Sequence, residues 1–129
     1  MLALDLLFRG DVSPKDPGAP EYAQMVSAMG DRPLGMQAAQ LIGIARWLVG
    51  RGAQRIRLES TGARSQISTL TAAALEPAQF SGVEIHDGIE SLAKLLEAPI
   101  TYEAAPDLFC LDLYKEFDVD WLAALAKAK

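Results

Sequence analysis

Short apolar segments alternate along this chain with segments of helical periodicity. The segment 2–8 is mostly apolar, and 55–60 and 83–86 alternate polar with apolar residues, so their lengths and patterns predict strands. Apolar residues recur at three- and four-residue steps over 34–49 and again over 65–75, which predicts helices. Strands joined by helices form parallel sheets with right-handed connections. The sequence therefore predicts an α/β fold, with a small parallel sheet in three αβα layers.

Prolines, glycines and acids indicate where the helices begin and end. Pro33 suits the first turn of the helix over 34–49, and Gly50 ends it. Three prolines within 13–20 predict a surface loop. Further helices are predicted in three places: 21–29, 89–96 and 118–127. Asp118 is expected to cap the last of them.

The composition is that of one globular domain covering residues 1–129. Half of the residues (50%) are hydrophobic and 22% are charged, which excludes a disordered chain. The net charge of −5 makes nucleic acid an unexpected partner, because an acidic surface repels phosphates. No apolar stretch is long enough to cross a membrane and the chain starts without a basic signal segment, so a soluble, cytoplasmic protein is expected. Cys110 lies among apolar residues and is predicted to be a buried structural thiol.

The turn between the second strand and its helix, Ser60-Thr-Gly-Ala-Arg64, is the candidate site. Parallel sheets bind ligands at the carboxyl ends of their strands, where a helix N-terminus offers free N–H groups. Gly62 would let the backbone approach a ligand, Arg64 could hold an anion, and Thr61 and Ala63 would complete the oxyanion or anion contacts. The alternative is a tight strand-to-helix connection, with Ser60 or Thr61 as the helix cap.

Several segments share a pattern with one known family. They are 2–11, 32–35, 56–62, 72–75, 87–91 and 113–118. Together they resemble the central part of bacterial acetyl-xylan-esterase-like proteins of the α/β-hydrolase superfamily. The resemblance covers nearly the whole chain, which would be a partial domain relative to the family, and it implies that 56–62 corresponds to the nucleophile strand and elbow.

The catalytic residues of that family are not in their places. A nucleophile elbow reads Gly-x-Ser-x-Gly, whereas the outer positions here are Ser60 and Arg64 and the nucleophile position is Gly62. Ser60 is the candidate substitute nucleophile, and Ser65 lies nearby. The family places its acid and then its histidine after the nucleophile, but the single histidine, His86, precedes every acid of the tail.

The remaining polar residues predict structural roles. His86 is expected to be a hydrogen-bonded structural histidine beside Asp87. Asp112, Asp118 and Asp120 are expected to be surface charges or helix caps. No spacing of histidine, cysteine and carboxylate residues predicts a metal site, and no cofactor is expected.

The resemblance also implies missing strands. In the α/β-hydrolase sheet, another strand lies between those that 2–8 and 55–60 resemble, and this chain lacks it. Open sheet edges are usually protected or paired, so a homo-oligomer formed through a sheet edge or an exposed helix face is expected. The polar residues Arg55, Arg57 and Glu59 instead favour a strand face that meets solvent.

Three interpretations of function follow. The first is an esterase-like domain without activity as an isolated chain, serving as a binding or assembly module. The second is a fragment of a longer esterase-like protein. The third is an active carboxylester hydrolase, acting through Ser60 on acylated carbohydrate or another small ester.

Overall fold

The computed structural model describes residues 1–127. Its α-helices within this range are α1 (Ala19–Ala28), α2 (Pro33–Gly50), α3 (Ala63–Leu75), α4 (Lys94–Glu97), α5 (Leu111–Glu116) and α6 (Val119–Lys127). Its strands are β1 (Arg57–Thr61) and β2 (Gly82–His86), and two short 3-10 helices are η1 (Gly10–Val12) and η2 (Pro106–Leu108). The fold is therefore mixed α/β, as the alternating pattern predicts.

The two strands form a parallel sheet, and α3 connects them. Leu58 lies beside Val83, and Thr61 lies beside His86. A helix between two parallel strands is the arrangement predicted from the sequence, so this prediction is confirmed.

The segment 2–8 does not form the predicted strand. Side chains of α2 bind its backbone: the Leu7 N–H donates to Gln40 Oε1 at 2.9 Å, and Gln37 Nε2 donates to the Leu7 carbonyl at 2.7 Å. Leu6 and Phe8 are buried. The segment is therefore held against α2 and does not pair with the sheet. Its apolar content alone does not distinguish these two structures.

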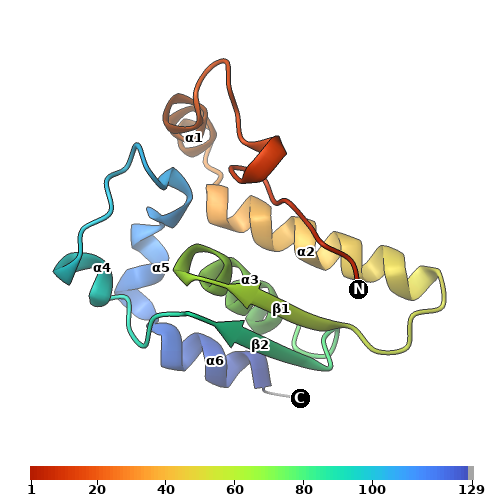
Figure 1. The fold of residues 1–129 in the computed structure, drawn as a ribbon. Coiled ribbons are helices and arrows are strands. Elements are labelled where there is room, and N and C mark those ends of the chain that lie inside the picture. Colours follow the sequence, from red (N-terminus) through yellow and green to blue (C-terminus); the bar gives the residue numbers. More distant parts are fainter. Residues whose placement is uncertain (128–129) are drawn as a thin grey trace.

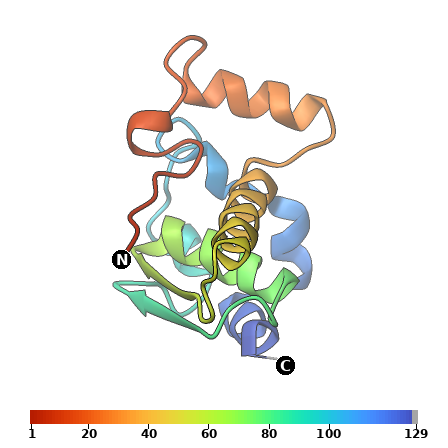
Figure 2. The ribbon, with the colours of Figure 1, turned by 90° about the vertical axis from the view of Figure 1, so that its right-hand side faces the viewer.

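The helices lie on one face of the sheet. Figures 1 and 2 show the strands along one side of the molecule, with α2, α3 and α6 packed together on the other. Leu58 and Ser60 of β1 face these helices, whereas Arg57, Glu59 and Thr61 alternate with them and are exposed. Within residues 1–127 no helix covers this second face, so the predicted three-layer arrangement is not confirmed.

Helix α3 contributes to both clusters of buried apolar residues. Ile67 and Leu70 belong to a cluster with α6 and η2, and Ala72 and Ala73 belong to a second one with α2 and Phe80. The small alanine side chains allow close approach of α2. Because α3 packs in both clusters, the turn between β1 and α3 is held in one position relative to the other helices.

The segment after β2 is less helical than predicted. In place of the predicted helix over 89–96 the structure has the short α4, Lys94–Glu97, and the carboxylate of Asp118 binds the residues before it. It accepts hydrogen bonds from the Ser91 hydroxyl at 2.6 Å and from the Leu92 N–H at 2.7 Å. The same carboxylate accepts the N–H of Val119, the first residue of α6, at 2.7 Å, so Asp118 lies at the helix start where the sequence predicts a cap.

Asp118 should therefore make stability depend on pH. The hydrogen bond from the Leu92 N–H, and then that from Ser91, lower the pKa of Asp118 below its ordinary value. A lowered folded-state pKa contributes stability above the unfolded value of about 3.9, and this contribution is lost as the pH falls through the folded value. We expect Asp118→Ala to lower the free energy of unfolding by about 1–2 kcal/mol at neutral pH.

Urea unfolding at neutral and at acidic pH measures this effect. The difference between wild type and Asp118→Ala should shrink at the acidic pH, where the wild-type carboxylate is protonated. Asp120→Ala is the matched control, because the exposed Asp120 bonds only the N–H of the next residue. An equal loss of stability in both variants would contradict the role assigned to Asp118.

Candidate functional site

The turn between β1 and α3 has the geometry of an uncapped helix N-terminus. Gly62 lies at the N-cap position with a φ of 81°, a left-handed conformation that favours glycine. Its N–H donates to the His86 carbonyl at 2.8 Å, which ties the turn to the end of β2. The connection is tight, with Gly62 alone between β1 and α3, but neither Ser60 nor Thr61 caps the helix, so that part of the alternative is wrong.

The first turn of α3 presents backbone donors. The N–H groups of Ala63, Arg64 and Ser65 precede the first intrahelical bond, which runs from the Gln66 N–H to the Gly62 carbonyl at 3.0 Å. No side chain of the described residues caps this turn. These groups and the positive end of the helix dipole favour an anion here.

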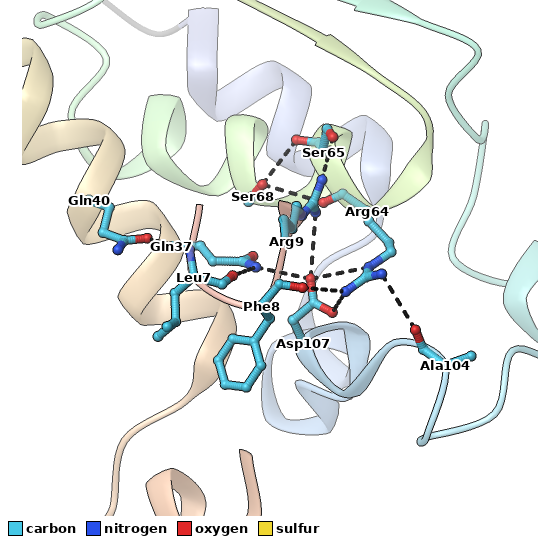
Figure 3. Close-up of polar contacts among 10 residues, drawn as sticks. All are labelled: Leu7, Phe8, Arg9, Gln37, Gln40, Arg64, Ser65, Ser68, Ala104 and Asp107. Carbon is cyan, nitrogen blue, oxygen red and sulfur yellow. Dashed lines mark hydrogen bonds and ion pairs between the residues drawn. The ribbon is translucent and has the colours of Figure 1, made fainter. Parts of the chain in front are cut away.

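A buried carboxylate, Asp107 of η2, holds the side chain of Arg64. Figure 3 shows the two side chains face to face, with Arg64 Nη2 donating to Oδ1 at 2.5 Å and Nε to Oδ2 at 3.4 Å. Asp107 is only 2% exposed and also accepts from Gln37 Nε2 at 3.0 Å. Arg64 further donates to the carbonyl oxygens of Phe8 and Ala104 at 3.3 and 3.4 Å. Its predicted availability to an anion is thus reduced by a structural ion pair.

A second arginine shares the same carboxylate. Arg9 Nη2 lies 3.5 Å from Asp107 Oδ2, and Arg9 Nη1 donates to the hydroxyl of Ser65 (Figure 3). Its buried Nε and Nη2 have no hydrogen-bond partner. Burial is the largest effect on the pKa of Arg9 and lowers it from its ordinary value. The attraction of Asp107 raises this pKa, and the repulsion from Arg64 lowers it. Two guanidinium groups therefore share one carboxylate, which leaves one positive charge uncompensated within the cluster.

Ser60 and His86 lie on opposite faces of the sheet. Ser60 points to the covered face, where it is buried and its hydroxyl has no hydrogen-bond partner. His86 pairs in register with Thr61 on the open face, where its Nε2 lies 3.2 Å from Glu59 Oε1 and 3.5 Å from Glu84 Oε1. The acidic neighbours of the histidine are therefore Glu59 on the adjacent strand and Glu84 on its own strand, in place of the predicted Asp87.

Neither candidate serine has an activating base. A serine nucleophile needs a histidine or equivalent base within hydrogen-bond reach of its hydroxyl. The Ser65 hydroxyl accepts a hydrogen bond from Arg9, a permanent cation that removes no proton. The Ser60 hydroxyl contacts no polar group among the described residues.

Other polar residues of the tail have the structural roles predicted for them. Asp112 accepts a hydrogen bond from Arg32 Nη2 at 2.8 Å, which lowers the pKa of this exposed carboxyl group. Cys110 is buried, and burial raises the pKa of its thiol. Within residues 1–127 no cluster of histidine, cysteine and acidic side chains could hold a metal ion, and no helix is long and apolar enough to cross a membrane.

A mostly apolar cavity lies outside this site. It has a volume of about 750 Å³ and is lined by residues between Leu92 and Trp121, including Leu96 and Phe109. None of the residues predicted for the β1–α3 turn lines it.

Arg9, Gln37 and Asp107 are the site residues that sequence reasoning missed. Asp107 stands alone between Pro106 and Leu108 in an apolar stretch, and an isolated acid in such surroundings is a signal for a buried, paired carboxylate. The sequence gives no comparable signal for its partners.

The fold and the site together define a mixed α/β domain with an uncapped helix N-terminus held by a buried arginine–aspartate cluster. No family model, no curated protein and no solved structure matches this chain.

Proposed function

We propose that this chain is an α/β-hydrolase-like, esterase-like domain without hydrolase activity, which serves as a binding or assembly module. The observation that carries the proposal is the separation of Ser60 and His86 on opposite faces of the sheet. Adjacent residues of a strand point to opposite faces, so no rotamer change brings the two side chains together. Gly62 also supports the lack of activity, because it stands where the nucleophile elbow of the α/β-hydrolase family has its serine.

The binding role is assigned to the turn Thr61–Arg64. Its support is the free N–H groups of the first turn of α3 together with the uncompensated charge of the Arg9–Arg64–Asp107 cluster. A small anion, or the carbonyl oxygen of an ester, is the ligand class that such donors favour.

The assembly role is assigned to the sheet. Two strands with helices on one face leave an uncovered face and two unpaired edges within the described residues. Sheets of this size are rarely stable on their own and are usually completed or protected. An added partner would supply the missing part of a three-layer hydrolase-like arrangement.

Labelling with a fluorophosphonate tests the inactive state directly. This reagent marks an activated serine whatever its natural substrate. We expect no stoichiometric adduct in intact-mass measurements of the folded protein, because neither Ser60 nor Ser65 has a base beside it.

Ser60→Ala and Ser65→Ala variants provide the matched controls. A stoichiometric adduct that disappears only in Ser60→Ala would overturn the proposal and establish the carboxylester hydrolase instead. An adduct that disappears only in Ser65→Ala would overturn it as well, with the catalytic centre at the first turn of α3.

A further inference from the structure

We propose that a second copy of this chain completes the sheet, with residues 1–5 of each copy added as a strand along the open edge of β1 in the other. The inference rests on the assembly role proposed above and names the segment and the edge that perform it. Its ligand is therefore another copy of the same chain, bound through backbone hydrogen bonds.

The acceptor is the edge of β1 that faces away from β2. In the described residues β1 pairs with β2 alone, so the backbone groups of its other edge have no strand partner. An unpaired edge of this kind is a template for another strand.

The donor is the start of the chain. Figure 1 shows the start of the chain without a helix or strand, and the backbone of residues 1–5 makes no hydrogen bond within the described residues. Leu2 and Leu4 are 56% and 40% exposed, which is unfavourable for two leucines in a five-residue stretch. Leu6 is buried in its own copy, so only the residues before it are free to cross.

The alternation of the segment matches the two faces of β1. With Leu2 and Leu4 on the covered face they would extend the apolar surface around Leu58, which is only partly buried. Asp5 would then lie on the open face, which carries both Arg57 and Glu59. Arg57 already pairs with Glu84 of its own copy, so Asp5 would be a second carboxylate beside this guanidinium, a favourable cross-strand arrangement at the Arg57 end of the strand.

The exchange costs little in each copy. Asp5 gives up one exposed hydrogen bond, which it accepts from the Asp11 N–H at 3.2 Å. Figure 2 shows the N-terminus and the two strands on the same side of the molecule, so one approach brings both segment and edge to the partner. Because each copy carries both, a two-fold dimer uses both donor segments and both open edges of β1, and the exchange closes.

Sedimentation of the full chain across the micromolar range measures the exchange. We expect a monomer–dimer equilibrium that Leu4→Asp weakens by at least about tenfold, since a charge would enter the covered face. Leu96→Asp is the matched control: this leucine is 83% exposed and lines the apolar cavity, outside the donor and the edge.

A charge exchange makes the test independent of folding. Asp5→Arg and Arg57→Asp should each weaken the dimer, and the double variant should associate more tightly than either, which general damage to the fold would not do. Arg57→Asp also removes the pair with Glu84 of the same copy, and the comparison with this single variant allows for that loss. A monomer at every concentration, dissociation by Leu96→Asp in place of Leu4→Asp, or no rescue in the double variant would each overturn the inference. All three outcomes leave the fluorophosphonate result, and with it the proposed lack of hydrolase activity, untouched.

Discussion

Replacing Asp107 with asparagine is expected to lower the free energy of unfolding by about 3–5 kcal/mol. The carboxylate is almost fully buried and faces the guanidinium groups of Arg9 and Arg64. The neutral amide would leave the mostly buried Arg9 and the partly exposed Arg64 without a counter-charge, and that loss exceeds the contribution of the hydrogen bonds themselves. Urea unfolding followed by circular dichroism at neutral pH measures the change.

Asp112→Asn is the matched control for this substitution. Asp112 also pairs with an arginine, Arg32 at 2.8 Å, but both side chains are exposed, and such pairs contribute less than about 1 kcal/mol. The structure therefore predicts very different outcomes for two aspartate–arginine pairs. A loss below about 1 kcal/mol for Asp107→Asn would mean that water reaches the cluster, and its assigned burial would be wrong.

The elements that the sequence predicted well are those with strong local patterns. The apolar stripe of α2 and the alternation in β1 and β2 place these elements to within about two residues, because their periodicities differ clearly. The segment 2–8 has no periodicity to separate a strand from an anchored extended segment. Its structure depends on hydrogen bonds to Gln37 and Gln40, which lie 30 and 33 residues further along the chain than Leu7.

The candidate site was located from sequence only in part. The turn Thr61–Arg64 follows from the order strand, glycine, helix, which local patterns show. The partner of Arg64 does not, because Asp107 lies 43 residues further along the chain. Periodicity says which residues are buried within an element but not which elements meet, so the cluster that orients Arg64 was beyond sequence reasoning.

Ile67→Ala is expected to lower the free energy of unfolding by about 2–5 kcal/mol. Ile67 is fully buried (0% exposed) at the middle of α3, in the cluster formed with η2 and α6. Truncation removes apolar contacts and leaves a cavity in the helix that contacts both strands and two other helices. Thermal and urea unfolding of the variant measure the loss.

Leu75→Ala, at the end of the same helix, separates burial from helix propensity. Leu75 is 64% exposed, so its truncation should change stability by less than about 0.5 kcal/mol. Equal losses for the two substitutions would contradict the central position of α3. The large difference we expect would show that the buried side of α3 packs against η2 and α6, and this packing positions the free N–H groups of its first turn for a ligand.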